Sequence, residues 1–574
     1  MAQPVLSGHN YSFKTEIHAT FRSHVLRDIG TGGRRIKATY IAESTAQKTK
    51  GYDMYRRFFR WSSDRLNENG VIAFVTNNNF IDAKEADGLR KVIAREFNEV
   101  WVVDLKGNAR TSGEPRRKEG GNIFHDQIRV GVAIWFCVKK AGTHGCKIMY
   151  EAVRDYAKAD EKLSFISSRA LSDRQFELIK PDSKNNWINL SGNDFETLLP
   201  MASKDTKAAS TSAKERAIFK LFSNGINTAR DGWVTDEAAD NLAEKARFFI
   251  AHYDKHIQSA KVHDTIIKWS RNLKVKLARG EREPFNKTHI VRYAYRPYFS
   301  NFLYQSELMI DELGQLPAMC RAVNSLIAMP AAGDFRCLAT DRACDFHFIG
   351  DSRVLSLYRY DEASTRQDNI TDWALRQFST HYADEIGKGR AARKISKDAI
   401  FHYCYAVLHD PLYREKYAQN LKREFPRIPF YAGFWQWADW GEALMQLHIG
   451  YEQVAPFALT RTDTPDEKAR AAGLPPKAML RADPSAGVIT LDSETTLRGI
   501  PSEAWTYKLG NRSAMEWVLD QYKEKKPKDL TIREKFDTYR FADYKEKVID
   551  LLLRVTTVSV ETVRITDAMA KASR

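Results

Sequence analysis

The sequence has no apolar run near the roughly 18 residues that a membrane-spanning helix requires. Its N-terminus begins MAQPVLSGHNYSFK and lacks the apolar stretch of a secretory signal peptide. These two absences predict a soluble, cytoplasmic protein that does not associate with a membrane.

Cysteine is sparse, because the 574 residues contain only six, and no two of them have CxxC spacing. Reduced thiols are therefore expected in place of a disulfide framework. Cys337, Cys344 and His347 are residue types that bind zinc, but their spacing is irregular and no fourth ligand follows them. The sequence therefore predicts no metal site.

Two catalytic signatures are also missing. The fourteen histidines show no HExxH spacing and no GxxxxGK[ST] loop occurs, so neither a metalloprotease nor an ATPase is expected. ExK triplets within residues 522–547 superficially resemble those of nucleases. Both signs of charge are interspersed there along predicted helices, so a solvated helix face is the better interpretation.

Positive charge is plentiful. The formal net charge is +16 and the isoelectric point is about 9.3. Lysine and arginine side chains that contact phosphates release condensed counterions, so nucleic acid is the first partner to consider. A solvated lysine-rich surface would give the same net charge, and composition does not separate the two.

The first part of the chain alternates helix-like and strand-like patterns. Residues 52–66 and 86–97 have apolar side chains at helical spacing. Short apolar runs at 71–75, 100–105 and 128–138 predict strands, the first of them a buried parallel strand followed by a polar loop. This order is typical of the second half of a doubly wound α/β sheet.

The rest of the chain divides into a mixed and a helical part. Strands around 291–304 and 346–360 and a helix over 236–256 predict an α+β domain. Beyond residue 395 helices dominate, with Pro and Gly breaks between them. The predicted helices are 399–408, 412–425, 434–447, 513–525 and 544–554.

Long blocks of the sequence resemble the Type ISP restriction-modification enzymes. TYIAESTAQKTKGYDMYRRFFRWSSDRL (39–66) and GGNIFHDQIRVGVAIWFCVKK (120–140) are similar to the family's methyltransferase region. SNGINTARDGWV (223–234) and YRPYFSNFLY (295–304) are similar to its target-recognition region. The resemblance keeps the family's order and covers nearly the whole chain from about residue 40.

The resemblance implies three domains. Residues 1–195 correspond to part of a Rossmann-like adenine methyltransferase domain, which is the second half of its sheet. Residues 196–390 correspond to an α+β target-recognition region, and residues 391–574 to the mostly helical C-terminal part of the specificity domain. The expected function is sequence-specific recognition of double-stranded DNA within a restriction-modification system.

The resemblance also implies S-adenosylmethionine as the cofactor of the complete enzyme. Such an enzyme needs a Gly-rich turn after its first strand and an Asn-Pro-Pro-Tyr tetrapeptide, or Asp-Pro-Pro-Tyr, that holds the flipped adenine. Neither occurs here. We therefore expect that the cofactor does not bind this chain alone. If strand 71–75 normally pairs with the strand that carries this tetrapeptide, its edge is open here, and either another polypeptide supplies the missing strands or the first 50 or so residues cover the edge.

A partner would then complete the enzyme. An upstream polypeptide with nuclease, helicase and N-terminal methyltransferase parts is the expected source of the missing half. Two alternatives remain open, which are a DNA-binding specificity subunit without catalysis and an inactive truncated relic.

The candidate base-binding residues lie in the first domain. Phe124 precedes the third strand, where the resemblance implies an aromatic ring that stacks on the flipped base; a core residue is the alternative. Asn77, Asn78 and Phe80 follow the first strand and either border the adenine pocket or cap the next helix.

The candidate DNA-binding residues fall in two places. A polar loop carries Arg110, Arg116, Arg117 and Lys118, which predict either a phosphate clamp or a solvated loop. The ARDGWV and YRPY blocks match the family's recognition region, and arginine can bond a guanine edge bidentately. From these blocks we select Thr228, Arg230, Tyr295 and Arg296.

Overall fold

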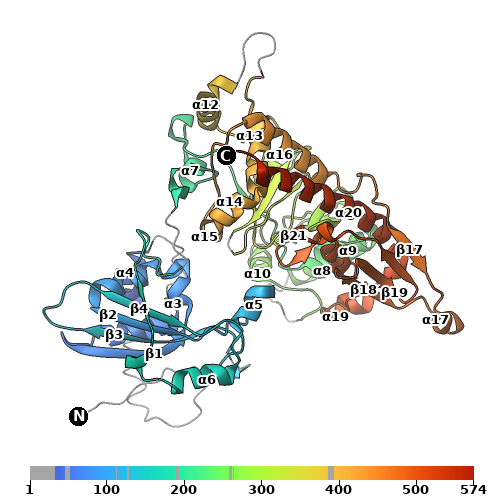
Figure 1. Cartoon of the computed structure of the whole chain (residues 1–574). Helices are drawn as coiled ribbons and strands as arrows, with labels where there is room; N and C mark the ends of the chain where they lie inside the picture. The colour runs from blue at the N-terminus through green and yellow to red at the C-terminus, as the bar shows by residue number, and fades with distance from the viewer. Residues whose placement is uncertain are drawn as a thin grey trace. The chain divides into compact units, whose positions relative to one another are not determined.

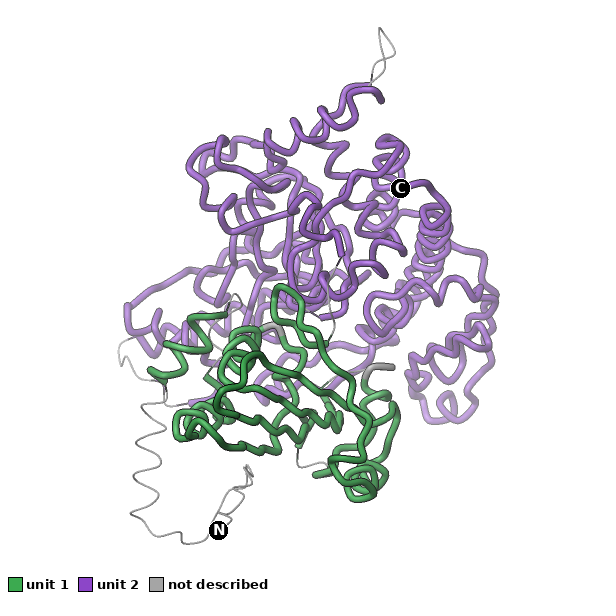
Figure 2. Tube along the Cα trace, turned by 60° about the vertical axis from the view of Figure 1, so that its left-hand side comes forward, with its two compact units in different colours: residues 1–192 green, residues 193–574 purple. Residues whose placement is uncertain are grey.

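The computed structural model describes residues 33–44, 52–110, 113–125, 128–188, 193–257, 262, 264–331, 333–385 and 393–574. The chain forms two compact units, residues 1–192 and 193–574, each considered by itself (Figure 2). The boundary between them lies close to the predicted one at 195/196. Among the described residues, no helix is both long and apolar enough to cross a membrane.

Unit 1 (residues 1–192) contains a mixed five-stranded sheet with the order β1-β3-β2-β4-β5 (Figure 1). β3 lies antiparallel between β1 and β2, whereas β2 and β4 are parallel neighbours. β1 and β2 therefore run in the same direction but do not pair. The strands are β1 (Gly70–Asn77), β2 (Glu99–Asp104), β3 (Val132–Lys139), β4 (Lys147–Ala152) and β5 (Glu177–Ile179).

The prediction that residues 71–75 form a buried parallel strand is wrong. β1 pairs antiparallel with β3, with Phe74 opposite Trp135, and Val71 is 59% exposed. We predicted a buried strand because residues 71–75 are apolar, but within β1 only Ile72 is fully buried. β1 ends the strand order, and within the described ranges no strand pairs with its other side, as the predicted open edge requires.

Two helices of unit 1 confirm the helices predicted over 52–66 and 86–97. They are α2 (Met54–Ser63) and α4 (Asp87–Glu96), and the sheet core packs against both. Trp135 of β3 stacks with Phe59 of α2 at 4.3 Å and with Phe80 of α3 (Asn79–Asp82) at 4.2 Å. All three rings are buried, so this aromatic cluster joins α2 and α3 to the sheet.

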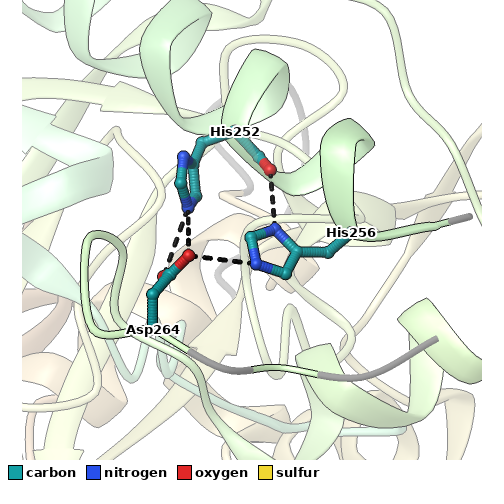
Figure 3. Close-up of side chains that lie close together, drawn as sticks. All are labelled: His252, His256 and Asp264. Carbon is teal, nitrogen blue, oxygen red and sulfur yellow. Dashed lines mark hydrogen bonds and ion pairs between the residues drawn. The ribbon is translucent and has the colours of Figure 1, made fainter. Parts of the chain in front are cut away.

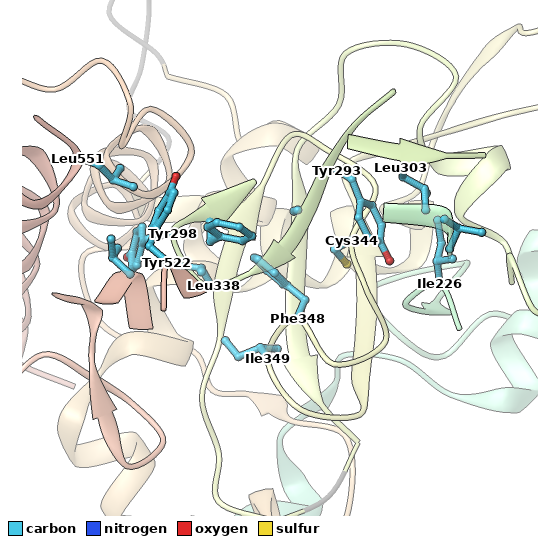
Figure 4. Close-up of a cluster of buried hydrophobic side chains, with 14 of the residues drawn as sticks. Ile226, Tyr293, Tyr298, Leu303, Leu338, Cys344, Phe348, Ile349, Tyr522 and Leu551 are labelled. Carbon is cyan, nitrogen blue, oxygen red and sulfur yellow. The ribbon is translucent and has the colours of Figure 1, made fainter. Parts of the chain in front are cut away.

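Unit 2 (residues 193–574) has one large core built from segments far apart in the sequence. The hairpin β9 (Ile290–Arg296) and β10 (Phe299–Tyr304) and helix α9 (Ala239–Ile257) match the predicted strands and helix. Figure 4 shows Tyr522 and Leu551 in the same cluster as Tyr298 and Leu338.

This shared core removes the predicted division at 390/391. That boundary falls at residues 386–392, which lie outside the described residues, but the segments on its two sides pack into one cluster and one unit. The periodicity of a short segment indicates its own helix or strand, but it does not indicate which distant segment packs against it.

A second cluster surrounds α13 (Lys397–His409) and α16 (Phe434–Ile449), which confirm two predicted helices. A Cβ atom at Gly441 would lie 1.8 Å from the carbonyl oxygen of His402, so only glycine permits these helices to approach so closely. The chain ends with α20 (Phe541–Lys571), which extends the predicted helix 544–554.

The prediction of a mostly helical C-terminal region omits a sheet. Four antiparallel strands, in the order β17-β20-β19-β18, lie between α16 and α18 (Ala514–Gln521). Every residue of β17 is exposed, so this strand lacks the apolar run by which a strand is recognised, whereas β19 contains the buried Ile489 and Leu491 and was missed. The strands are β17 (Thr460–Asp463), β18 (Ala478–Asp483), β19 (Val488–Asp492) and β20 (Thr495–Arg498).

Candidate nucleic-acid interface

A groove of about 720 Å³ lies in unit 2 between the ARDGWV block, the β9–β10 hairpin and residues 521–544. Seven basic and four acidic side chains line it. Four of the basic ones belong to a lysine segment (residues 523–528), which consists of Lys523, Lys525, Lys526 and Lys528 together with intervening residues. The groove therefore has an excess of positive charge, as a polyanion site requires.

Two hydrogen bonds hold the residues that follow the lysine segment against the ARDGWV block and α9. Trp233 of α8 (Asp231–Val234) donates its indole N–H to Asp529 Oδ2 across 2.8 Å. Asn241 donates to the carbonyl oxygen of Phe536 at 3.1 Å. These two bonds connect the start of unit 2 to residues nearly 300 positions later, so the lysines are fixed beside the ARDGWV block.

The lysine side chains themselves are exposed. Lys523 and Lys525 are 45% and 60% exposed and lie 3.6 and 3.5 Å from Asp520. Within the part of the chain that the structure describes, Lys526 and Lys528 form no ion pair. These two ammonium groups are therefore available to a phosphate without first breaking an internal contact.

The ARDGWV and YRPY blocks meet in a buried polar network. Asp231 accepts hydrogen bonds from Thr228 and, at 2.9 Å, from the hydroxyl of Tyr295. Arg296 bonds Asp345 at 2.7 Å, and its guanidinium carbon lies 3.9 Å from the centre of the Tyr295 ring. The structure thus brings together the residues predicted from both blocks.

The contacts show which of these residues can reach a ligand. Thr228 is 1% exposed and its hydroxyl bonds Asp231, whereas Tyr295 lines the groove. The guanidinium group of Arg296 is engaged in an ion pair with Asp345. Burial raises the pKa of the Asp345 carboxyl group. Tyr295 is therefore the member of the network with a surface on the groove.

The prediction that Arg230 contacts DNA is corrected. Its side chain has no exposed surface; it forms an ion pair with Asp311 at 2.9 Å and donates to the carbonyl oxygens of Met309 and Lys268. Desolvation lowers the pKa of this guanidinium group. A buried, fully paired arginine organises the loop beside the groove and cannot touch a phosphate in this structure.

The groove also contains groups that sequence reasoning missed. The floor includes Glu237 and Asn301, and each has one buried side-chain oxygen, Oε1 and Oδ1, that lacks a hydrogen-bond partner among the described residues. Burial raises the pKa of Glu237 to about 7. The only sequence signal for the lysine segment was its charge, which we assigned to a solvated face.

In unit 1 the predicted base-binding residues gather where β1 and β2 end and β3 begins. Asn78 donates from Nδ2 to Asp104 at 2.9 Å and so ties the ends of β1 and β2 together. A Cβ atom at Gly131 would lie 2.4 Å from Asn78 Oδ1, so a larger residue there would displace the Asn78 side chain. The side chain of Asn77 accepts from the N–H of Asn79 at 2.9 Å.

The contacts of Asn78 and Phe80 indicate which of them can border a pocket. Asn78 stands at the N-cap of α3, but its side chain makes no capping bond. Phe80 has 0% exposed surface and belongs to the Trp135 cluster, so it offers no face to a pocket in this structure. The expectation that Phe80 borders an adenine pocket is corrected on this ground.

Phe124 lies in the loop before β3 and is half-buried. It packs against the small cluster of Val103, Leu105, Val132 and Val153. Asn122 supports this loop, because its Oδ1 accepts from the N–H of Phe124 at 2.9 Å and its Nδ2 donates to Val130 at 2.8 Å. The ring therefore has one side on the core and a remaining part toward solvent, and its role in base stacking stays a prediction.

The predicted phosphate clamp is not a loop throughout. Arg116, Arg117 and Lys118 lie on α5 (Gly113–Glu119), while Arg110 precedes it and is exposed. Arg116 caps the helix end by bonding Gly120 at 2.7 Å, and Lys118 lies 3.9 Å from Asp155. Arg110, Arg117 and Lys118 are exposed, and their contact with phosphates stays a prediction.

The three rejected zinc ligands do not share one environment. Cys337 lies 3.6 Å from His409 and 3.4 Å from Arg414. His347 instead faces Asp351 at 3.5 Å on the surface.

Comparisons with known proteins agree on one family. Residues 217–551 match the Type ISP C-terminal specificity domain. The cryoEM structure of the DrdV–DNA complex is 47% identical, with a TM-score of 0.86 over 95% of this chain and 55% of that chain. No curated protein matches the chain.

Two further structures are similar. A nuclease-deletion mutant of the Type ISP restriction-modification enzyme LlaGI, in complex with a DNA substrate mimic, is 28% identical, with a TM-score of 0.77 over 94% of this chain and 42% of that one. The ATP-dependent Type ISP enzyme LlaBIII, bound to DNA, is 24% identical and shares the fold, with a TM-score of 0.80 over 97% of this chain and 36% of that one.

The chain thus spans between 36% and 55% of the length of these three structures. The family match covers more than half of its residues and includes the groove, the ARDGWV block and the YRPY block. The chain therefore belongs to the Type ISP restriction-modification family and contains its C-terminal specificity domain.

Proposed function

We propose that unit 2 recognises a specific sequence in duplex DNA and that DNA binds along the groove and its lysine segment (residues 523–528). The observation that carries this proposal is the exposed lysine segment bonded to the ARDGWV block through Trp233 and Asp529. Similar structures of this family are DNA complexes, which supports the same partner here.

The groove separates two kinds of contact. Lys526 and Lys528 lie on its rim and supply charge to the phosphates, which positions the duplex without reading its sequence. Tyr295, Asn301 and Glu237 lie on its lining and are the candidates for contact with bases. In this structure the Tyr295 hydroxyl donates to Asp231, and the unpaired oxygens Asn301 Oδ1 and Glu237 Oε1 are buried.

We further propose that unit 1 is part of an adenine-specific, S-adenosylmethionine-dependent methyltransferase. The support is the arrangement of Asn77, Asn78 and Phe124 near the ends of β1, β2 and the start of β3. Phe124 is the candidate to stack on a flipped adenine, a contact of about 1–3 kcal/mol.

The residues described here do not fit the cofactor. Asp104 is the acidic residue at the end of β2, and both of its oxygens are occupied by Asn78, the N–H of Lys106 and the hydroxyl of Tyr150. No Gly-rich turn follows β1 within the described residues. We therefore propose that other polypeptide supplies the cofactor site and that catalysis depends on it.

Salt-dependent DNA binding tests the recognition function. We expect the chain to bind a duplex that contains its target with an affinity that falls steeply as salt rises. Replacing Lys526 and Lys528 with alanine should weaken binding to all duplexes about equally and reduce the slope of log K against log salt by about two. Fluorescence anisotropy measures both quantities.

A matched control uses Lys468 and Lys477, which are exposed and do not line the groove. Their double alanine variant loses the same charge and should keep the wild-type slope. Equal losses in the two double variants would show that the whole basic surface binds DNA and would overturn the groove as the site.

A specificity subunit without catalysis is the second candidate, and the occupied Asp104 carboxylate favours it. Calorimetry with S-adenosylmethionine separates the two functions. Binding only after addition of the upstream polypeptide supports the methyltransferase, whereas no binding in either case leaves the specificity subunit or an inactive relic. Binding to the chain alone would contradict the assignment of the cofactor site to other polypeptide.

A further inference from the structure

Three potential ligands meet at the end of helix α9 in unit 2. His252 and His256 are four residues apart on the helix, so they lie on the same side, and Asp264 approaches from the following segment. Figure 3 shows both imidazole rings turned toward the Asp264 carboxylate. One oxygen of Asp264, Oδ2, lies 3.0 Å from Nε2 of each histidine.

The backbone determines which nitrogen of His256 faces Asp264. The Nδ1 atom of His256 lies 3.0 Å from the carbonyl oxygen of His252, which can only accept a hydrogen bond. Nδ1 therefore carries the proton, and a neutral His256 presents the lone pair of Nε2 to a carboxylate oxygen. Two acceptors at 3.0 Å repel each other unless a proton or a metal ion lies between them.

The donor set suits a transition metal. Zinc in proteins takes imidazole nitrogens and carboxylate oxygens at about 2.0–2.2 Å in a tetrahedral arrangement. This geometry separates neighbouring ligand atoms by roughly 3.3 Å, close to the two contacts of 3.0 Å found here. All three potential ligand atoms lie within 4.8 Å of one another, so small side-chain adjustments can bring them to one ion.

The surroundings also suit a bound ion. The side chains of His252 and His256 are only 12% and 13% exposed, and that of Asp264 is 30% exposed. Trp269 packs edge-on against His256 and the ring of Phe248 is parallel to that of His252, so aromatic rings restrict solvent on these sides. The bond from His256 Nδ1 to a carbonyl oxygen is the usual outer contact of a metal-bound histidine.

We propose that His252, His256 and Asp264 bind a divalent metal ion of the zinc class, with water as the fourth ligand. The ion would connect the end of α9 to the segment that starts at Asp264. That segment continues to Lys268 and Ser270, which bond the buried Arg230, and Lys268 also lines the groove. The role is structural, because it holds this wall of the groove, and the site itself does not depend on DNA binding.

The sequence analysis predicted no metal site, and its one signal for this site was incomplete: His252 and His256 have the spacing of the two histidines of HExxH but lack its Glu. Two histidines at positions i and i+4 are common on helices, and Asp264 lies eight residues beyond His256 in no known ligand spacing. Only the tertiary structure shows the Asp264 carboxylate beside the two rings.

Titration of the metal-free full chain with Co²⁺ tests the proposal. We expect one equivalent to bind and to give the intense visible absorption of a tetrahedral site, and Zn²⁺ should displace it. Zn²⁺ should also raise the melting temperature in proportion to its binding. The variants His252→Asn and His256→Asn should each weaken binding at least tenfold, a loss typical of a removed ligand.

His347→Asn is the matched control, because His347 also lies beside a carboxylate, that of Asp351, but has no third potential ligand near it among the described residues. This variant should bind the metal as the wild type does. Absence of the cobalt spectrum in the wild type would mean that a proton occupies the gap between Asp264 and His256, and it would overturn the proposal.

Equal metal binding by His256→Asn and the wild type would overturn it as well. Far-UV circular dichroism verifies that each variant is folded. If a variant is unfolded, the cobalt spectrum and the zinc-dependent melting temperature of the wild type still decide the question.

Discussion

Trp233 donates its indole N–H to Asp529 across 2.8 Å, although 296 residues separate the two. Trp233 is 1% exposed and packs against Phe249 and Phe536, so the ring is fixed on one side and its N–H on the other. Asp529 follows the lysine segment (residues 523–528) directly. This hydrogen bond, together with the one from Asn241 to the carbonyl oxygen of Phe536, places the four exposed lysines beside the ARDGWV block.

The variant Trp233→Phe keeps a buried ring but removes this donor. Asp529 Oδ2 then loses its donor, while Oδ1 keeps the N–H of Ile532, so we expect a loss of about 1–3 kcal/mol in the free energy of unfolding. DNA affinity should fall several-fold under conditions in which the variant is folded, because the lysine segment is held less firmly. Urea unfolding and fluorescence anisotropy measure the two effects.

Trp517→Phe is the control for this variant. Trp517 also donates its indole N–H, to Leu509 at 3.0 Å, but does not line the groove. It should lose some stability and keep its DNA affinity. The same affinity loss in both variants would contradict the role given to the Trp233–Asp529 bond.

The variant Arg230→Ala should lower the free energy of unfolding and leave the electrostatic attraction to DNA unchanged. The substitution leaves the largely buried Asp311 without its charged partner, with only the Ser270 hydroxyl still bonded to it, which costs about 3–5 kcal/mol. We expect a much lower urea midpoint and, at low temperature where the variant is folded, an unchanged salt slope of DNA binding. A slope reduced by about one would instead indicate that Arg230 reaches a phosphate.

A matched exposed arginine checks that result. Arg279 is 70% exposed and lies 3.6 Å from Glu281. Arg279→Ala removes the same charge from the surface, and we expect its urea midpoint to stay at the wild-type value.

The pH dependence of stability should report on His448. Its Nε2 faces the hydroxyl of Thr562 at 2.9 Å, and that hydroxyl donates to Val558, so Nε2 carries the proton. Nδ1 then accepts from the hydroxyl of Tyr405 at 2.7 Å. Burial, with a smaller contribution from Arg414, lowers the pKa of His448 to about 3.

The unfolded state of His448 has an ordinary pKa near 6.5, so between this value and about 3 the unfolded state binds the extra proton. Stability should therefore fall as the pH falls below about 6.5, by up to about 1.4 kcal/mol per pH unit. His409 is the neighbouring buried histidine, and burial lowers its pKa as well.

His448→Gln separates the two histidines. Glutamine does not titrate, so the difference in unfolding free energy between variant and wild type should shrink as the pH falls from 7 to 5. A constant difference over this range would show that His448 is not the titrating group. Guanidinium unfolding at several pH values gives the measurement.

Phe80 and Phe124 were predicted for the same pocket, and alanine variants distinguish them. Phe80→Ala removes a fully buried ring from the Trp135 cluster and should cost about 3–5 kcal/mol. Phe124→Ala removes a half-buried ring and should cost clearly less. Equal costs in urea unfolding would favour a core role for Phe124 over base stacking.

Local patterns predicted several elements well. Periodicity over ten or more residues identified α4, α9, α13 and α16, because their apolar faces repeat with the helical period. The strand 71–75 was found, but its neighbours and burial were not, since an apolar run looks the same in an edge strand and a central one. The sheet β17–β20 was missed because its strands are short and partly exposed.

The candidate site was predicted less completely than the fold. The ARDGWV and YRPY blocks were selected together, and Tyr295 does line the groove. Arg230 was misjudged, since a sequence does not say whether an arginine has an internal carboxylate partner such as Asp311. The lysine segment was assigned to a solvated face, because charge alone cannot say what lies opposite it.

The sequence by itself determined the family, the basic character of the protein and the position of most helices. Each of these is encoded in residue order, total charge or a short periodic window. Only the tertiary structure decided that residues 193–574 form one unit, that Trp233 meets Asp529 and that Asp264 faces His252 and His256. Such contacts depend on how packed cores bring distant segments together, and no window along the chain contains both partners.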